Sequence, residues 1–167
     1  MQKWRIWLLV LFFGVALSTT LAAAQFLLFP NFRIGKTAPD FKLKTITGKD
    51  AAFSAVRAGG NTVLFFWTTW CPNCSREIAA LDEKINKLKA DNIQMVLVDV
   101  GEESRLVAKY AAERKLPPEI LLDEDGAVST QYGVVGIPTY VFIDKKGVIR
   151  GIENVFPEDY QAFFRPS

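Results

Sequence analysis

Two cysteines separated by two residues are the side chains best suited to carry out chemistry. Cys71 and Cys74 enclose Pro72 and Asn73, and the chain has no other cysteine. On a helix this spacing puts the two thiols one turn apart, close enough to form a disulfide. One thiol can attack a substrate disulfide, and the other can resolve the mixed disulfide. The pattern predicts a redox-active Cys71–Cys74 pair, with a structural disulfide or a half-occupied metal site as alternatives.

The composition restricts what else this pair can do. The 167 residues include no histidine, which excludes a His-dependent catalytic triad and histidine metal ligands. Two cysteines alone also do not complete a four-ligand structural zinc site. We therefore expect no metal, and no cofactor other than the disulfide itself.

The cysteine pair is predicted to lie where a buried strand meets a helix. Residues 62–67 are nearly all apolar, which is typical of a strand buried on both faces. Pro72 suits the first turn of a helix, which makes Cys71 its cap. There the helix dipole and the unpaired N–H groups stabilise the Cys71 thiolate. The apolar positions that follow at helical spacing are Cys74, Ile78, Leu81, Ile85 and Leu88.

The whole pattern predicts an α/β fold in which a sheet of parallel and antiparallel strands carries helices on both faces. The predicted strands, of which the first two form an N-terminal β-hairpin, are residues 41–45, 51–53, 62–67, 93–100, 120–122, 139–143 and 148–151. The predicted helices are residues 72–90, 102–115 and 157–164, with a helical turn at 127–132. In the second helix, Leu106, Val107, Tyr110 and Ala111 are expected to face the core.

Two separated segments resemble the thioredoxin superfamily. Residues 66–74 read FWTTWCPNC, and residues 136–139 read GIPT. Residues 35–41 (GKTAPDF), Glu77, residues 100–102 (VGE) and an apolar N-terminal segment further resemble its TlpA/ResA branch. Members of that branch are membrane-anchored, extracytoplasmic thiol–disulfide oxidoreductases. The resemblance implies a thioredoxin-like three-layer fold.

The resemblance also implies a function. ResA acts in cytochrome c maturation, so the expected substrate is a protein disulfide such as that of apocytochrome c. Electrons would come from a membrane thiol donor of the CcdA/DsbD type. A peroxiredoxin-like peroxidase is an alternative, because Thr68 matches the peroxidase pattern three residues before the cysteine, although Leu64 stands where that family has proline. A non-catalytic binding module with a thioredoxin fold is another.

The resemblance assigns substrate contacts to residues around the cysteines. These are Trp70 and Pro72 in the first segment, and Ile137 and Pro138 in the second. We expect the Ile137–Pro138 bond to be cis and to face Cys71, since a cis bond before proline costs only ~0.5–1 kcal/mol. This geometry would leave the Ile137 backbone free to pair with an extended substrate peptide.

Glu77 is the third candidate catalytic residue. On a helical wheel it falls about 60° from Cys74, at the edge of the apolar face. Partial burial there predicts a raised pKa. Such an acid beside Cys74 could remove or supply the proton of the resolving thiol, whereas the alternative is an ordinary exposed glutamate. Thioredoxin has a buried aspartate six residues before its first cysteine, where this chain has Phe65.

Other carboxylates are assigned structural roles. Asp99 and Asp144 end predicted strands and are expected to serve as turn or cap residues. Glu102 is expected to add negative charge to the first turn of a helix, although the resemblance places it near the site.

The N-terminal segment predicts a membrane anchor. Residues 6–29 carry no charge and as a helix would span about 36 Å, enough to cross a ~30 Å hydrocarbon core. Lys3 and Arg5 favour a cytoplasmic N-terminus. The alternative is a signal peptide cleaved near residues 22–24, but the apolar run continues beyond that point. We expect an uncleaved single-pass anchor.

The expected organisation follows from this anchor. Residues 1–5 would be cytoplasmic, residues 6–29 would cross the membrane, and residues 30–40 would link the anchor to a thioredoxin-like domain at 41–167 on the extracytoplasmic face. Of the 20 basic residues, two precede residue 31, which leaves 18 against 18 acidic residues in the rest of the chain. A neutral domain argues against nucleic-acid binding.

Overall fold

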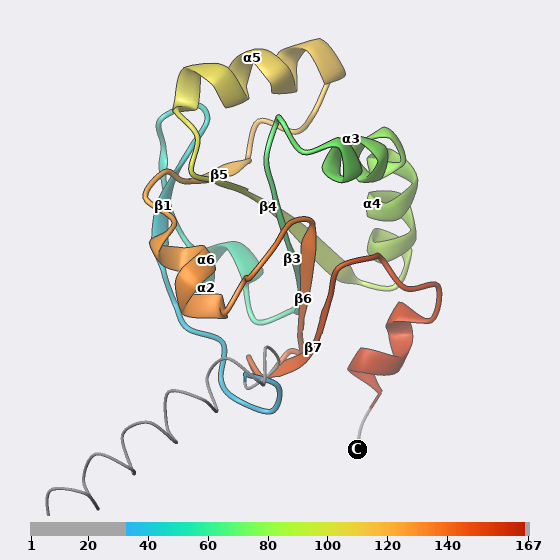
Figure 1. Ribbon diagram of the computed structural model, residues 1–167. Coiled ribbons are helices and arrows are strands. Elements are labelled where there is room, and N and C mark those ends of the chain that lie inside the picture. Colours follow the sequence, from blue (N-terminus) through green and yellow to red (C-terminus); the bar gives the residue numbers. More distant parts are fainter. Residues whose placement is uncertain (1–32, 166–167) are drawn as a thin grey trace, which may run out of the picture. The chain divides into compact units, whose positions relative to one another are not determined.

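A seven-stranded mixed sheet forms the centre of the molecule (Figure 1). The structure is a computed structural model that describes residues 33–165. The strands are β1 (Lys42–Thr45), β2 (Asp50–Ala52), β3 (Asn61–Trp67), β4 (Ile93–Val100), β5 (Leu121–Asp123), β6 (Thr139–Ile143) and β7 (Ile149–Glu153). Their order is β2-β1-β5-β4-β3-β6-β7. Strand β4 runs parallel to β3 and β5, and the other neighbours are antiparallel.

Helices cover both faces of this sheet. They are α2 (Phe53–Arg57), α3 (Pro72–Ala79), α4 (Leu81–Ala90), α5 (Ser104–Arg114), α6 (Ala127–Tyr132) and the 3-10 helix η1 (Tyr160–Phe164). One apolar cluster joins α3, α4, α5 and η1 to the sheet, and a second joins α2 and α6 to its other face. The expected thioredoxin-like three-layer fold with an N-terminal β-hairpin is confirmed.

Strand β3 is central because its side chains supply both cores. Phe65 and Trp67 lie in the cluster that includes the cysteines, whereas Leu64 and Phe66 lie in the other cluster. All four are fully buried. Burying each of these large apolar side chains contributes about 1.5–3 kcal/mol, so the strand that leads to Cys71 is held firmly on both sides.

The predicted long helix after Cys71 is two helices, α3 and α4. Ala80 between them has φ −105° and ψ 16°, which is not helical. The Glu77 carbonyl at this break accepts hydrogen bonds from Ala80 N at 3.3 Å and from Lys84 Nζ at 3.2 Å. The apolar spacing continues across the break, with Ile78 and Leu81 both buried. This continuity explains why the spacing predicted one helix.

Three smaller predictions differ from the structure. Phe53 begins helix α2 rather than ending a strand. Its ring stacks on that of Phe41, with centroids 4.9 Å apart. The C-terminal segment forms only η1, a short 3-10 helix, and not a helix over 157–164. Leu106 is 50% exposed, whereas Val107 beside it is fully buried, so Leu106 does not face the core from α5.

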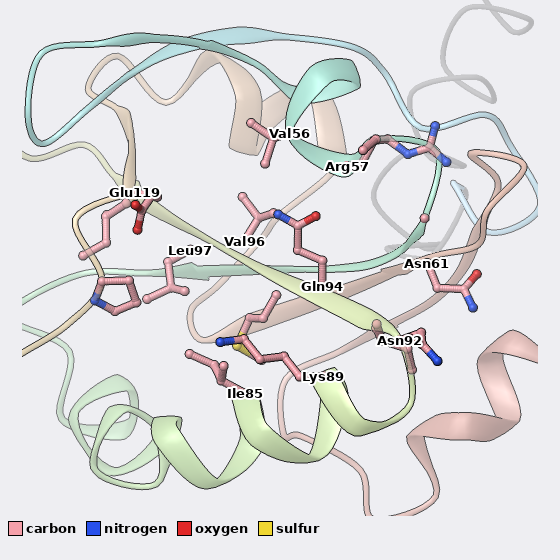
Figure 2. A pocket seen from close by; sticks show the side chains of 16 residues that line it. Val56, Arg57, Asn61, Ile85, Lys89, Asn92, Gln94, Val96, Leu97 and Glu119 are labelled. Carbon is pink, nitrogen blue, oxygen red and sulfur yellow. The ribbon is translucent and has the colours of Figure 1, made fainter.

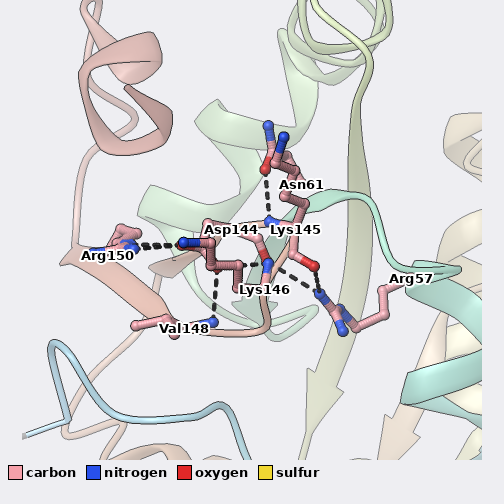
Figure 3. A network of polar contacts seen from close by, with 7 residues as sticks. All are labelled: Arg57, Asn61, Asp144, Lys145, Lys146, Val148 and Arg150. Carbon is pink, nitrogen blue, oxygen red and sulfur yellow. Dashed lines mark hydrogen bonds and ion pairs between the residues drawn. The ribbon is translucent and has the colours of Figure 1, made fainter. Parts of the chain in front are cut away.

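The turn between β6 and β7 is organised by Asp144 (Figure 3). Its Oδ1 accepts hydrogen bonds from the amides of Lys146 and Val148, each at 2.9 Å. Its Oδ2 forms an ion pair with Arg150 at 2.7 Å. Arg57 of α2 donates to the Asp144 carbonyl at 3.1 Å, which ties the turn to the helix. The prediction that Asp144 is a turn residue is confirmed.

Gly151 makes room for an aromatic stack beside β7. A Cβ atom added there would overlap the ring of Phe163, which stacks on Phe142 with centroids 4.3 Å apart. We expect Gly151→Ala to lower the free energy of unfolding by about 1–3 kcal/mol, because an extra methyl overfills this space. Urea unfolding measures the change. Gly136→Ala is the control, since nothing lies within 4 Å of its added Cβ, and equal stability losses in both variants would contradict the prediction.

The predicted anchor at residues 6–29 and the predicted cytoplasmic residues 1–5 lie outside the described residues. Among residues 33–165, no helix has both the length and the apolar composition that a membrane crossing requires. Residues 33–165 belong to a compact unit that begins at Arg33. Within it, the backbone N–H groups of Gly35 and Ala38 donate hydrogen bonds to the carbonyls of Ile149 and Gly147. The first residues of the unit therefore lie alongside the turn between β6 and β7.

Candidate active site

The two cysteines lie where β3 meets α3. Cys71 has an extended backbone and is the N-cap of α3, and Pro72 is the first helical residue. The Cys71 sulfur accepts a hydrogen bond from the backbone N–H of Cys74 at 3.2 Å. Both thiols are free, with Cys71 5% and Cys74 0% exposed. Of the two cysteines, Cys71 is therefore the one that retains some exposed surface.

The GIPT segment meets the cysteines from the start of β6. The Ile137–Pro138 bond is cis, as expected. The Cys71 thiol donates to the Ile137 carbonyl at 3.8 Å. The Pro138 carbonyl in turn accepts a hydrogen bond from Asn154 Nδ2 at 2.8 Å. The fold therefore places Ile137 and Pro138 beside Cys71, although Ile137 follows Cys71 by 66 residues in the sequence.

Exposed apolar side chains flank this contact. Trp70, directly before Cys71, is 70% exposed, and Val135, two residues before Ile137, is 84% exposed. Pro72 is exposed as well. Large apolar side chains that face solvent next to a reactive group are typical of a surface that binds another protein.

The environment of Cys74 disfavours its thiolate. Burial, together with the contact with the Cys71 sulfur, raises the pKa of the Cys74 thiol to about 12. The backbone amide of Thr68 opposes this in part. A buried thiol of this kind reacts only if a base removes its proton.

Glu77 is half-buried on α3 and has two strong partners. Its Oε2 accepts a hydrogen bond from the Tyr140 hydroxyl at 2.6 Å and forms an ion pair with Lys84 at 2.9 Å. Burial raises the pKa of Glu77, but the Tyr140 and Lys84 contacts outweigh it, and the net pKa lies below its ordinary value. The predicted raised pKa is therefore wrong, because sequence spacing identified the burial but not the partners.

Tyr140 is a site residue that the sequence reasoning missed. It is fully buried on β6, two residues after Pro138. Its ring stacks on Phe65 with centroids 4.6 Å apart. Phe65, which stands where thioredoxin has a buried aspartate, thus supports the tyrosine that holds Glu77.

Two further acidic residues, Glu102 and Asp99, lie near the loop that precedes Cys71. Glu102 accepts hydrogen bonds from Thr69 N and Thr69 Oγ1, both at 2.6 Å. It precedes α5, whose N-cap is Glu103, so the prediction that Glu102 belongs to a first helical turn is wrong. Asp99 is fully buried within β4. The prediction that Asp99 is a turn or cap residue, which is based on its position at a strand end, is therefore wrong.

A cavity lies where β3 and β4 begin (Figure 2). It has a volume of about 600 Å³ and is lined by Asn61 and Ile93, which begin β3 and β4. Cys71 instead follows the far end of β3. Within residues 33–165, no three His, Cys, Asp or Glu side chains are grouped to hold a metal ion.

Comparison with known proteins agrees with this geometry. The chain matches the AhpC/TSA family over residues 34–152. It is 33% identical over 145 residues to the thiol-disulfide oxidoreductase ResA of Geobacillus thermodenitrificans, a match that covers 83% of each chain. It resembles the crystal structure of StoA from Bacillus subtilis, with a TM-score of 0.62, 27% identity and coverage of 75% of this chain and 96% of StoA. It also resembles the peroxidoxin BcpB from Mycobacterium tuberculosis, with a TM-score of 0.66, 26% identity and coverage of 78% and 91%.

The family match includes every strand from β1 to β6 and both segments of the site. The cysteine pair, Glu77 and the cis Ile137–Pro138 bond all lie within residues 34–152. The ResA relative extends the agreement over most of both chains. The chain therefore belongs to the AhpC/TSA family and is a thioredoxin-like thiol–disulfide oxidoreductase of the ResA type.

Proposed function

We propose that the chain reduces protein disulfides through Cys71 and Cys74. The Cys71 thiolate attacks one sulfur of the substrate disulfide, that disulfide breaks, and the departing sulfur takes a proton. The Cys74 sulfur then attacks Cys71, loses its proton, and releases the second substrate thiol. Two electrons pass to the substrate, and a Cys71–Cys74 disulfide forms. The observation that carries this proposal is the position of Cys71, the less buried of the two cysteines, which caps α3 and faces the Ile137 carbonyl.

The residues around Cys71 are assigned to substrate binding. Trp70 and Pro72 would contact the substrate on one side, and the backbone of Ile137, held next to Pro138, would pair with an extended peptide on the other. The exposed apolar side chains of Trp70 and Val135 support this assignment. The reaction needs no cofactor beyond the two thiols.

The substrate and the location are inferred from the ResA relatives and from the apolar N-terminal segment. The protein would be held in the membrane by residues 6–29, with its domain on the extracytoplasmic face. There it would reduce disulfides such as that of apocytochrome c during cytochrome c maturation. A membrane thiol donor of the CcdA/DsbD type would return Cys71 and Cys74 to the dithiol state.

The reduction potential of the Cys71–Cys74 pair tests the direction of this reaction. Equilibrating the full-length chain against thiol–disulfide buffers should give a value below ~−200 mV, toward the thioredoxin end of the scale. A value near ~−120 mV, that of a strong oxidant, would mean that the protein donates disulfides and would contradict the reductase proposal.

A peroxidase is the second candidate, because the chain has a similar fold to a peroxidoxin and carries Thr68 three residues before Cys71. Leu64 stands where the peroxidase pattern has proline and is fully buried in β3. We expect no thiol-dependent consumption of hydrogen peroxide above that of the Cys71→Ser variant. Rapid consumption that requires Cys71 would favour the peroxidase instead.

A further inference from the structure

Asp99 is a buried carboxyl group with no ordinary partner. Its side chain is fully buried on β4, with Trp67 of β3 and Leu122 of β5 as register neighbours. No hydrogen-bond donor in the described part of the chain reaches either of its oxygens. Burying a charged carboxylate without donors is very costly, so the group must be stabilised in another way.

The neighbouring carboxylates already have their donors. Asp123 on β5 accepts hydrogen bonds from the amides of Val128 and Ser129, at 3.0 and 2.7 Å. Glu102 accepts its two hydrogen bonds from Thr69, one at each oxygen. Among these three acidic side chains, Asp99 is the one left without a donor, and its hydrogen-bonding neighbour is Glu102. Two carboxyl groups can bond to each other only if one of them carries a proton.

We propose that Asp99 is a protonated carboxylic acid at neutral pH, that it donates a hydrogen bond to Glu102, and that it thereby positions the loop before Cys71. The proton is best placed on Asp99, because Glu102 uses both oxygens to accept from Thr69. Burial, the hydrogen bond to Glu102 and the charges of Glu102 and Asp123 together raise the pKa of Asp99 to about 9.

The proposed hydrogen bond acts on the active site through one chain of contacts. Asp99 holds Glu102, Glu102 holds the backbone and side chain of Thr69, and Thr69 precedes Cys71 by two residues. Loss of the proton would put a second negative charge, with no donor of its own, beside Glu102 behind this loop. Asp99 is thus a positioning residue, and its ionisation near pH 9 should change the reactivity of Cys71. The effect on Cys71 reactivity rests on the proposed function, whereas the protonation of Asp99 does not depend on it.

The infrared spectrum of the reduced full-length chain tests the proton directly. A protonated carboxylic acid has a carbonyl stretch well separated from that of a carboxylate. We expect this band at neutral pH in the wild type, its loss in Asp99→Asn, and its persistence in the exposed control Glu124→Gln. A wild-type spectrum without a band that Asp99→Asn removes would overturn the proposal. It would do so whatever the enzyme's substrate, since the band is independent of turnover.

The rate of Cys71 alkylation by iodoacetamide, measured across pH, tests the positioning role. Asp99→Asn keeps a donor for Glu102 and should react like the wild type at neutral pH, but without the inflection that the ionisation of Asp99 adds near pH 9. Asp99→Leu keeps no donor, and its rate should change by about tenfold, as expected for one lost hydrogen bond to a charged group. Identical pH profiles for the wild type, Asp99→Asn and Asp99→Leu would overturn the positioning role. If Asp99→Leu does not fold, the comparison of Asp99→Asn with the wild type near pH 9 decides it.

Discussion

Replacing Cys71 with serine is expected to abolish disulfide reduction. Cys71 is the less buried of the two cysteines and faces the Ile137 carbonyl, so we expect no mixed disulfide with a substrate to form without it. Loss of a covalent nucleophile typically lowers kcat on the order of 10⁴-fold or more. The measurement is the reduction of insulin by the full-length chain with a thiol as electron source. The wild type and Cys71→Ser should have similar stability, since serine retains an N-cap oxygen.

Cys74→Ser should stop the same reaction one step later. The hydrogen bond to the Cys71 sulfur comes from the backbone N–H of residue 74, so the first thiol keeps its geometry when the second is removed. Cys71 can then still attack, but nothing resolves the product, and a mixed disulfide with the substrate should accumulate on a non-reducing gel.

Biological function that survives Cys71→Ser would instead favour a non-catalytic binding module.

The position of the cysteines could be predicted because the signals for it are local. An apolar strand, a cap residue and a proline at the first helical position follow one another directly, and each restricts the backbone on its own. The cis bond and its place beside Cys71 could be expected only from resemblance to a family, since no local signal in residues 136–139 identifies a partner 66 residues away.

The ionisation of the acidic residues could not be predicted, because it depends on contacts between distant strands. Glu77 meets Tyr140 across 63 residues, and that contact, together with Lys84 beyond the helix break, reverses the sign expected from burial. Asp99 looked like a turn residue because it lies near a strand end. Its burial arises from β5, which pairs beside it and closes the sheet.

The lowered pKa of Glu77 leads to two opposite predictions for the resolving step. A charged Glu77 can accept the proton of Cys74 as that sulfur attacks, but Lys84 and Tyr140 make the carboxylate a weaker base than an ordinary glutamate. Glu77→Gln removes the base and should slow resolution by about 10²-fold or more. Lys84→Met removes the ammonium group, which lies 6.0 Å from the centre of the Phe156 ring, and keeps an unbranched side chain. It should raise the pKa of Glu77 and speed resolution a few-fold at neutral pH.

Release of thionitrobenzoate from a mixed disulfide preformed on Cys71 isolates this step, because only the attack of Cys74 produces the coloured thiolate. The sign of the pH effect follows from linkage: a carboxylate with a lowered pKa stays charged to lower pH, so the wild type should keep its rate further into acid than Lys84→Met does. Lys87→Met is the matched control, since Lys87 pairs with Glu83 on the exposed side of α4. If Glu77→Gln releases thionitrobenzoate at the wild-type rate, Glu77 is not the base for Cys74. If Lys84→Met and Lys87→Met have equal effects on that rate, the ion pair with Lys84 does not set the basicity of Glu77.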